Sequence, residues 1–416
     1  MSASEQVLGD LAEIVMGTSP PGASYNYERV GDPLLNGPTE FGPRHPFPAL
    51  YTTAARRFAQ PGDLLFCVRG STTGRMNWAD RHYAIGRGVA AIRGRTASET
   101  AFLRAAIELA LPGVLAGATG STMPNLNVDA IRRIPVPTNP NRERVGAILG
   151  VIDDLIENNR RRVEVLEEMA RAIYREWFVH FRYPGHGGVP LVDSPLGPIP
   201  GDWAVRRIGE IATTTAGPFG SKLGRKDYVE DGVPVIRGTN LRVGGGFDES
   251  DFVYVARTKA DELNSSSAYR GDLVITQRGT LGQIGLIPDE SRHERYVLSQ
   301  SQMKATAEPS AACPEFLYRH MSAPETTARF VSQSLISGVP HVNLTLLREF
   351  EILAPPVELQ NHFGGVVRVL DQNAWRCRDQ VRALTHVRDL VLPRLVTGRV
   401  DVSHLHLDAL PEAAIA

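Results

Sequence analysis

The segment 145–177 has the residue pattern of one long amphipathic α-helix. Apolar side chains recur in alternating steps of three and four, which is the spacing of a heptad seam. The seam positions are Val145, Ile148, Ile152, Leu155, Leu166, Met169 and Ile173, and the polar Asn159 and Arg162 interrupt them. A helix of about 35 residues is roughly 50 Å long, more than a small domain normally contains. We therefore expect this helix to pack against a second long helix.

A second segment with the same pattern lies near the end of the chain, at a constant offset that aligns Val145 with Phe363. The corresponding seam positions are Phe363, Val366, Leu370, Asn373, Cys377, Gln380, Leu384, Val387 and Val391. Apolar residues meet apolar residues except at Leu155, which meets Asn373, and the polar pair meets Cys377 and Gln380. One amphipathic helix alone is explained by core packing. Two helices that share a seam and its polar interruption favour packing against each other.

The repeat extends into the segments that precede the two helices. Gly62-Asp63 corresponds to Gly271-Asp272, Arg69-Gly70 to Arg278-Gly279, and Asn125-Leu126 to Asn343-Leu344. Short apolar runs bounded by Gly and Pro, such as 64–68, predict buried strands, while 101–111 predicts a short helix and 131–136 a last strand or extended piece. The sequence thus predicts two copies of one unit, each a mixed α/β globule followed by a long helix.

The predicted fold class is α+β: two similar mixed α/β domains are joined by two long antiparallel coiled-coil helices, with a pseudo-two-fold internal repeat. The first domain is expected at 1–140, its helix at 141–182 and a Gly/Pro-rich linker at 183–203. The second domain is expected at 204–357, its helix at 358–400 and a C-terminal tail at 401–416. The density of Gly and Pro in the linker favours an extended connection between domains.

Composition restricts the class of protein. Hydrophobic residues make up 42% and charged residues 22% of the 416 positions, ordinary values for a chain of two or three domains. The sequence contains neither an apolar run long enough to span a membrane nor a signal segment after Met1, so we expect a cytoplasmic protein without a membrane segment. Cys67, Cys313 and Cys377 lack CxxC spacing, which favours buried free thiols over a metal site or disulfides.

The charge balance gives a local hint of nucleic-acid binding. The net charge of −1 argues mildly against a nucleic-acid partner for the chain as a whole. Only four of the 45 basic residues are lysine, however, and residues 41–95 contain nine Arg against two Asp. The excess of arginine in this one region is the better indicator.

Motifs for catalysis are absent from the sequence. A phosphate-binding P-loop needs Gly-Lys, and no lysine follows a glycine. The segment RGTLGQIG at 278–285 lacks the spacing of a dinucleotide loop. Asp289 has no Asp/Glu-x-Lys partner for a Mg²⁺-dependent nuclease. APPV at 354–357 lacks the polar residue and the ring of an adenine methyltransferase motif. We expect no catalytic residue and no metal site, and we interpret His404 and His406 as solvated residues.

Taken together, these segments resemble the specificity (S) subunit of type I restriction–modification enzymes. The segments that carry the resemblance are PGDLLFCVRGSTTG, IDDLIENNRRRVEVLEEMARAIYREWFVHF, LGPIPGDW, ISGVPHVNLTLLREFEILAPP and VRDLVLPRLVTG. Their order, twice over, covers nearly the whole chain. The chain departs from the pattern in its second helix, which is less polar and less regular around 374–377.

The resemblance implies a non-catalytic subunit with two target-recognition domains on a helical spacer, acting in phage defence. Its implied partners are double-stranded DNA, two methyltransferase (modification) subunits and, in the full complex, motor-nuclease (restriction) subunits. It implies no cofactor for this chain, with S-adenosylmethionine on the methyltransferase subunits.

Two related domains on antiparallel helices suit a DNA target made of two short half-sites. The DNA backbone has the same approximate two-fold symmetry, and a duplex turn of about 34 Å is comparable in scale to the helices. Because the loops of the two domains differ, the half-sites are expected to differ in sequence. The helix pair is expected to fix their separation.

Polar residues in glycine-bounded loops are the candidates for DNA contact. Arginine suits guanine O6 and N7, Asn and Gln suit adenine N6 and N7, and Ser and Thr suit base edges or phosphates. The candidates are Arg44, Arg69, Ser71, Thr72, Arg75 and Arg87 in the first domain, and Arg237, Asn240, Arg278, Thr280 and Gln283 in the second. Loop solvation or phosphate contact is the competing interpretation for each of them.

Exposed faces of the long helices, including Arg160, Arg161 and Glu167, are candidates for partner contact, with ordinary solvated charge as the competing interpretation. Two other functions stay open at this point. The chain could be a stand-alone DNA nuclease or methyltransferase with atypical motifs, in which case it would act without partners. It could also be a coiled-coil adaptor for proteins, in which case it would bind no DNA.

Overall fold

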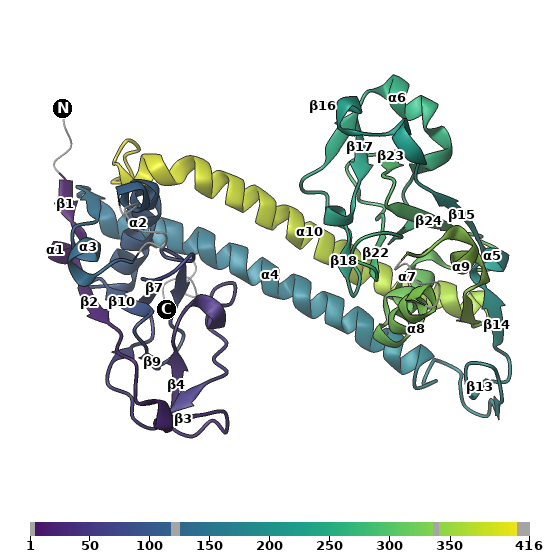
Figure 1. Cartoon of the computed structure of the whole chain (residues 1–416), viewed down its shortest axis with the longest axis horizontal. Helices are drawn as coiled ribbons and strands as arrows, with labels where there is room; N and C mark the ends of the chain where they lie inside the picture. Colours follow the sequence, from purple (N-terminus) through teal and green to yellow (C-terminus); the bar gives the residue numbers. More distant parts are fainter. Residues whose placement is uncertain (1–4, 118–124, 336–340, 406–416) are drawn as a thin grey trace. The chain divides into compact units, whose positions relative to one another are not determined.

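The computed structural model describes residues 5–117, 125–335 and 341–405, and these form two compact units. Unit 1 consists of Met1–Arg161 and Cys377–Ala416, and unit 2 of Arg162–Arg376. The two long helices, α4 (Arg142–Phe178) and α10 (Val357–Val396), each pass from one unit into the other (Figure 1). Each unit therefore contains one globular domain and one half of both helices. The predicted fold class, two mixed α/β domains with two long helices that pack together, is confirmed.

The globular domain of unit 1 contains two sheets. The first has the order β2-β10-β7-β8, formed by β2 (Glu13–Met16), β10 (Val89–Arg93), β7 (Leu64–Cys67) and β8 (Met76–Trp78). The second has the order β3-β5-β4-β9-β6, formed by β3 (Tyr25–Asn26), β5 (Tyr51–Thr52), β4 (Asp32–Leu35), β9 (Tyr83–Ile85) and β6 (Phe58–Ala59). Because β7 and β10 alternate their buried side chains between two hydrophobic clusters, they connect the layers of this domain.

Three more helices and a strand pair complete unit 1. The helices are α1 (Leu8–Leu11), α2 (Ala97–Gly117) and α3 (Val128–Arg132), and β1 (Glu5–Val7) pairs with β11 (Pro135–Pro137). The cluster that contains Phe66 and Phe102 also contains Val145 of α4 and Leu392 of α10. The first domain is thus built directly onto its halves of the long helices.

Unit 2 repeats this plan. Its first sheet has the order β15-β24-β21-β22-β18, formed by β15 (Ala212–Ala216), β24 (Gln302–Ala307), β21 (Asp272–Thr276), β22 (Gln283–Leu286) and β18 (Arg242–Val243). Its second has the order β16-β19-β17-β23-β20, formed by β16 (Tyr228–Val229), β19 (Val253–Val255), β17 (Val233–Ile236), β23 (Tyr296–Leu298) and β20 (Ser267–Ala268). The pair β14 (Ala204–Arg207) and β25 (Glu351–Ala354) corresponds to β1 and β11.

The helices of unit 2 are α5 (Ile208–Ile211), α6 (Arg257–Glu262), α7 (Pro314–Ser322), α8 (Pro324–Leu335) and α9 (Leu344–Glu349). The short strands β12 (Leu191–Val192) and β13 (Ile199–Pro200) lie in the segment expected as an extended linker. Its Tyr183, Ile199 and Trp203 are buried in one cluster with Phe178 and Phe363. The segment therefore packs against the core of unit 2 and is not a solvated linker, because it carries large apolar side chains between its glycines and prolines.

Burial along the two long helices repeats with the same constant offset that aligns Val145 with Phe363. The buried residues of α4 include Val145, Leu149, Ile156, Asn159, Ala170, Tyr174 and Phe178, and the corresponding positions on α10 are Phe363, Val367, Ala374, Cys377, Arg388, Leu392 and Val396, all of them buried. The polar interruption predicted at Asn159 and Cys377 is thus part of the buried stripe.

The expected seam itself was partly wrong. Leu155, Met169 and Val387 are exposed, while the neighbouring positions Ile156, Ala170 and Arg388 are buried. A strict heptad drifts by about 20° per seven residues from a straight helix of period 3.6. Each helix also packs against a globular domain, which widens and rotates its buried stripe.

The local alignment of the repeat and two of its elements also need correction. The side chain of Asn127 accepts a hydrogen bond from the backbone N–H of Ala130, and Asn343 accepts one from Leu346 in the same way. These two residues cap equivalent short helices, so Asn127, not Asn125, corresponds to Asn343. Residues 131 and 132, expected at the start of the last strand or extended piece, belong instead to a capped helix that covers 128–132. Helix α2 covers more residues than the expected 101–111. Residues 336–340, which begin the segment ISGVPHVNLTLLREFEILAPP, lie outside the described part of the chain.

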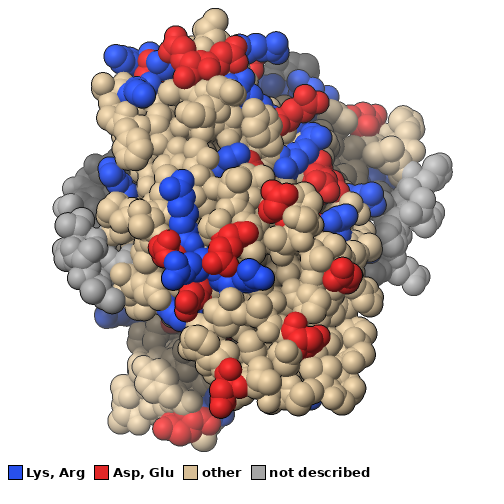
Figure 2. Space-filling view, turned by 90° about the vertical axis from the view of Figure 1, so that its right-hand side faces the viewer, with Lys and Arg blue, Asp and Glu red and all other residues tan. Residues whose placement is uncertain are grey.

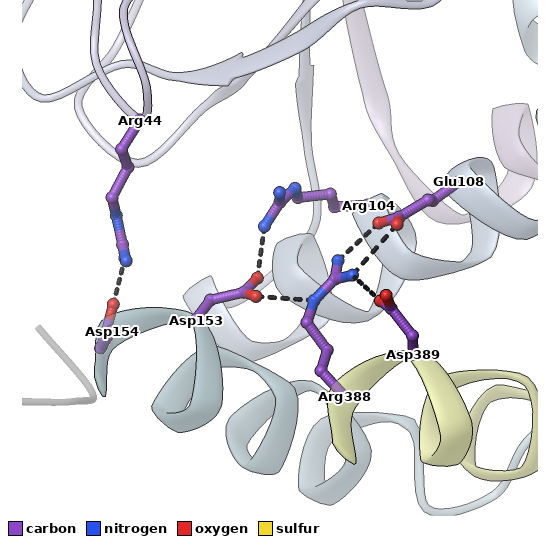
Figure 3. Close-up of polar contacts among 7 residues, drawn as sticks. All are labelled: Arg44, Arg104, Glu108, Asp153, Asp154, Arg388 and Asp389. Atoms are coloured by element: carbon purple, nitrogen blue, oxygen red, sulfur yellow. Dashed lines mark hydrogen bonds and ion pairs between the residues drawn. The ribbon is translucent and has the colours of Figure 1, made fainter. Parts of the chain in front are cut away.

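Charged side chains join the helices of unit 1 (Figure 3). The buried Arg388 of α10 donates to Glu108 of α2 at 2.5 and 3.1 Å and to Asp153 of α4 at 2.7 Å. Asp153 also accepts from Arg104 of α2. Burial by itself lowers the pKa of Arg388, but its hydrogen bonds to Glu108 and the charge of Asp153 outweigh this and leave the pKa raised. The guanidinium is therefore a permanent positive charge between three helices.

Aromatic side chains occupy the corresponding region of unit 2. The position of α4 that corresponds to Arg388 is Ala170, and Tyr174 and Phe178 follow it on the same face. The ring of Phe178 lies 4.8 Å from that of Phe316 and 5.0 Å from that of Phe363. The hydroxyl of Tyr174 lies 2.7 Å from Nδ1 of the buried His320. The two halves of the helix pair thus use different chemistry at equivalent positions.

Candidate nucleic-acid interface

Three turns meet at one edge of the first sheet of unit 1. Strand β2 ends, β10 begins and β7 ends at this edge, because Met16 pairs with Ala90 and Val89 with Cys67. We call the residues 17–19, 68–75 and 86–88 that extend beyond it the turn edge of unit 1. Backbone hydrogen bonds from Gly17 to Val89 and from Val68 to Gly88 hold the turns together at 2.9 and 3.0 Å.

Unit 2 has the same edge in its first sheet. Strands β15, β24 and β21 meet there through the pairs Ala216–Met303 and Thr276–Gln302. We call residues 217–226, 277–282 and 299–301 the turn edge of unit 2. The bond from Leu126 N–H to the carbonyl of Val68 in unit 1 recurs from Val342 to Gln277 in unit 2, at 2.9 and 3.0 Å. The two turn edges are therefore built alike.

An exposed arginine occupies the same position on both turn edges. Arg69 follows Val68 and Arg278 follows Gln277, and each lies in the hairpin turn that leaves the central strand of its sheet. Gly70 and Gly279 follow them with φ of 82° and 96°, a backbone conformation that favours glycine. The correspondence between Arg69 and Arg278, expected from the sequence repeat, is thus present in the structure, and both guanidiniums are presented to solvent by a tight turn.

Several other predicted residues lie exposed on the same edges. Ser71 and Thr72 belong to the hairpin turn of Arg69, and Thr280 to that of Arg278. Arg87 lies in the adjacent turn of unit 1, and its backbone N–H is 3.5 Å from the hydroxyl of Ser19. The structure therefore brings Arg69, Ser71, Thr72 and Arg87 together.

Two predicted arginines of unit 1 are engaged within the protein. The guanidinium of Arg75 donates to the carbonyls of Pro38 and Phe41 at 3.3 and 3.1 Å, which ties the segment 38–41 to the hairpin turn. Arg44 forms an ion pair with Asp154 of α4 (Figure 3). These side chains hold loops in place, and DNA contact by either would require it to leave or share a protein partner.

Three predicted residues of unit 2 form an internal hydrogen-bond network. Asn240 is fully buried, and its amide donates to the carbonyls of Asp248 and Ser250 at 3.1 and 3.0 Å. Gln283 donates to the carbonyls of Gly238 and Leu241 at 3.1 and 3.0 Å. Arg237 donates to the carbonyl and the carboxylate of Asp251 at 2.6 and 3.2 Å. The amides of Asn240 and Gln283 are thus used to shape the loop 237–251 and do not present their hydrogen-bonding groups to a base.

The turn edge of unit 2 also carries exposed residues that sequence reasoning missed. They are Phe219, Lys222, Arg225 and Lys226, all in the segment that follows β15. Two of the four lysines of the chain lie close together here, and that clustering was the available signal. Gln300 joins this segment to the hairpin turn: its amide donates to the carbonyls of Gly220 and, at 2.8 Å, Leu223, while its own carbonyl accepts from Gln277 at 2.7 Å.

Basic and acidic side chains lie interspersed on the face shown in Figure 2, and wide areas of that face carry neither. This distribution agrees with the net charge of −1. Any attraction to an anionic partner must therefore come from local groups such as the turn edges and not from a uniformly basic surface.

Comparison with known proteins connects this duplicated plan to one family. The family model described as "Type I restriction modification DNA specificity domain" matches residues 200–373. The type I restriction enzyme MjaIX specificity subunit of Methanocaldococcus jannaschii is 24% identical over 300 residues, which is 69% of this chain and 65% of that protein. The putative MjaX specificity subunit of the same organism is 33% identical over 165 residues, 39% of this chain and 38% of that protein.

A solved structure shares the fold over nearly the whole length. The S subunit of a type I restriction–modification system from M. genitalium superposes with a TM-score of 0.65 at 18% identity, covering 95% of this chain and 96% of that one. Residues 200–373 of this chain thus belong to the type I specificity-domain family, and the chain as a whole shares the fold of an S subunit. The aligned region spans less than two thirds of each of the two M. jannaschii relatives.

Residues on the exposed faces of the long helices are also predicted to contact partners. Arg160 and Arg161 of α4 are exposed, and Arg161 donates to Glu157 at 3.0 Å. Glu167 lies 3.7 Å from Arg171. These ion pairs are of the kind that exposed helices commonly carry, so the structure leaves partner contact by these residues a prediction.

The described residues contain neither a candidate metal site nor a candidate membrane span. No group of three or more His, Cys, Asp or Glu there could hold a metal ion, and no helix there is long and apolar enough to cross a membrane. Cys67, Cys313 and Cys377 are buried free thiols. His404 lies in the solvent-exposed tail, 3.9 Å from Asp401, and His406 is outside the described residues.

Proposed function

We propose that this specificity subunit is the non-catalytic DNA-sequence-recognition subunit of a type I restriction–modification complex, and that each unit reads one half of a bipartite target. The observation that carries the proposal is the duplicated turn edge, in which an exposed arginine leaves the same strand of the same sheet in both units. Two similar surfaces with different loops suit two half-sites of different sequence.

The proposed DNA contacts are the exposed members of the predicted set. They are Arg69, Ser71, Thr72 and Arg87 in unit 1 and Arg278 and Thr280 in unit 2. Arg278 and Arg69 suit bidentate recognition of guanine, since neither is held by an ion pair within the described residues. Asn240, Gln283 and Arg237 support the loop 237–251, while Arg75 and Arg44 hold loops of unit 1.

Partners and cofactors are part of the same proposal. The exposed faces of α4 and α10 would dock two methyltransferase subunits, and motor-nuclease subunits would join them in the full complex. S-adenosylmethionine would bind to the methyltransferase subunits, so this chain would need no cofactor of its own. Phosphate contacts supplied by the partners would compensate for its low net charge.

Sequencing of methylated adenines in the host genome, with and without the gene, tests the proposal directly. We expect one bipartite sequence with an indifferent gap to lose its methylation when the gene is deleted. A continuous target, or an unchanged methylation pattern, would contradict it. DNA cleavage or methylation by the purified chain alone would favour the stand-alone enzyme.

Arginine substitutions then assign each half-site to a unit. Arg69→Ala is expected to relax recognition of one half-site and Arg278→Ala that of the other. One bidentate guanine contact supplies about 1–3 kcal/mol of discrimination. The control is Arg133→Ala, an exposed arginine of unit 1 that belongs to neither turn edge and to neither long helix. Equal effects of both variants on both half-sites would refute the assignment.

Insertion of one heptad into both α4 and α10 tests whether the helices set the gap. Seven residues lengthen a helix by roughly 10 Å, and duplex DNA rises about 3.4 Å per base pair. The methylated target is therefore expected to change only in its gap, by about three base pairs. An unchanged gap would show that the helices do not determine the spacing.

A further inference from the structure

The ring of Phe219 is an unusual feature of the turn edge of unit 2. Its exposed fraction is 70%, although full burial of such a side chain contributes about 1.5–3 kcal/mol to folding. It precedes the short 3₁₀ turn Gly220–Lys222, in which Gly220 has φ of 64°. The next apolar residue, Leu223, is buried in the core of the domain.

The backbone around Phe219 is held on both sides. On one side the N–H of Gly217 donates to the carbonyl of Gln302 at 2.8 Å. On the other, the amide of Gln300 donates to the carbonyls of Gly220 and Leu223. The ring is therefore presented from an ordered loop, so a ligand that binds it meets a side chain whose backbone position is already fixed.

The charges next to this ring indicate the chemistry of its ligand. Lys222, Arg225 and Lys226 are exposed, and within the described residues none of them is in an ion pair. Arg278 lies in the adjacent turn, which Gln300 connects to this loop. An exposed aromatic ring amid unpaired cations suits a ligand with a polyanionic backbone and flat apolar surfaces, as in nucleic acid.

Unit 1 lacks this feature at the equivalent position. Gly17 and Gly217 make equivalent hydrogen bonds to the neighbouring strand, so Ser19 corresponds to Phe219. Ser19 is only half-exposed. An exposed aromatic ring at this position is thus a feature of the turn edge of unit 2 and not of that of unit 1.

We propose that the ring of Phe219 contacts base pairs of the half-site that unit 2 reads, while Lys222 and Lys226 contact the flanking phosphates. This inference rests on the proposed function and adds a specificity-determining residue to it. Apolar side chains discriminate bases by packing on the thymine methyl group or by entering a groove beside a base step. Phosphate contacts add affinity without discrimination.

The test measures the affinity of the full chain, assembled with its methyltransferase subunits, for two DNA duplexes. One duplex carries the methylated target, and the other has the half-site of unit 2 scrambled. Phe219→Ala is expected to weaken binding to the target on the order of 10-fold, as expected for one base contact, and to leave binding to the scrambled duplex unchanged. Lys222→Ala is expected to weaken both and to reduce the slope of log K against log salt by about 1.

Matched variants separate a base contact from an effect on folding. Phe219→Leu keeps an apolar side chain and is expected to retain part of the discrimination. Phe47→Ala removes a ring of unit 1 that is similarly exposed. It is expected to leave binding to the target duplex and to the scrambled duplex unchanged. Equal loss on both duplexes by Phe219→Ala, or no loss, would overturn the proposal for Phe219. Failure of the unaltered protein to distinguish the duplexes would instead overturn the proposed function, and this inference with it.

Discussion

Replacement of Arg388 by methionine is expected to destabilise unit 1 while leaving the shape of α10 intact. Methionine keeps the apolar stem of the side chain and removes the guanidinium that joins Glu108, Asp153 and Asp389 (Figure 3). Among the residues that the structure describes, Asp153 then keeps only Arg104 as a cationic partner. Glu108 loses its ion pair at a position where solvent can reach it only in part.

The size of the effect follows from burial. Breaking a buried ion pair by removing one partner costs about 3–5 kcal/mol, because the remaining charge stays desolvated. The side chain of Glu108 is 38% exposed, so water screens part of that cost, and about 3 kcal/mol is expected. For a unit of about 150–250 residues this corresponds to a fall of roughly 6–12 °C in the melting temperature.

Thermal unfolding of the full chain, followed by calorimetry, measures the loss in the transition of unit 1. Arg394→Ala on the same helix is the control, and its exposed side chain predicts a change below about 0.5 kcal/mol. Glu108→Gln added to Arg388→Met is expected to recover part of the loss, since it removes the carboxylate charge of Glu108 that has lost its ion pair with Arg388. A loss no larger than that of the control would refute the role of Arg388 in joining the three helices.

Two further perturbations test how α4 packs against the helices of the globular domains. Burial, with a smaller contribution from Arg329, lowers the pKa of His320 to about 3, so between pH 6.5 and 3 the unfolded chain binds a proton that native unit 2 does not. The stability of unit 2 should therefore fall as the pH drops through that window, by up to about 1.4 kcal/mol per pH unit. His320→Gln should flatten this dependence in pH-resolved thermal unfolding. On α4, a Cβ at Gly146 would lie 1.8 Å from the carbonyl oxygen of Ser98, and one at Gly150 would meet no atom within 4 Å. Gly146→Ala should cost about 1–3 kcal/mol in urea unfolding and Gly150→Ala should stabilise by about 0.5–1 kcal/mol; equal effects would show that α4 does not pack against α2 as described.

Periodic patterns made the architecture predictable. The two helices follow from a seam that repeats over many turns, and the duplication follows from an offset that is maintained along them. Such signals are local or cumulative, so they survive without knowledge of tertiary contacts. The correspondence between Arg69 and Arg278 in the sequence repeat was predictable for the same reason.

The sequence could not say which polar side chains are free. Asn240 and Gln283 are candidates by residue type because amides suit adenine, but their side-chain hydrogen bonds go to carbonyls up to 45 residues away. Arg44 is occupied by a carboxylate 110 residues further along the chain. A residue's type fixes which bonds it can form. Only the folded chain determines whether those bonds are already made.

The sequence by itself therefore determined a duplicated α/β plan on two long helices and the pair of hairpin arginines. The tertiary structure decided the rotation of the buried stripe, the local shift in the repeat and the set of side chains left exposed at each turn edge. The physical reason is that periodicity records which face of an element is buried, whereas hydrogen bonds and ion pairs between distant segments arise only when the chain has packed.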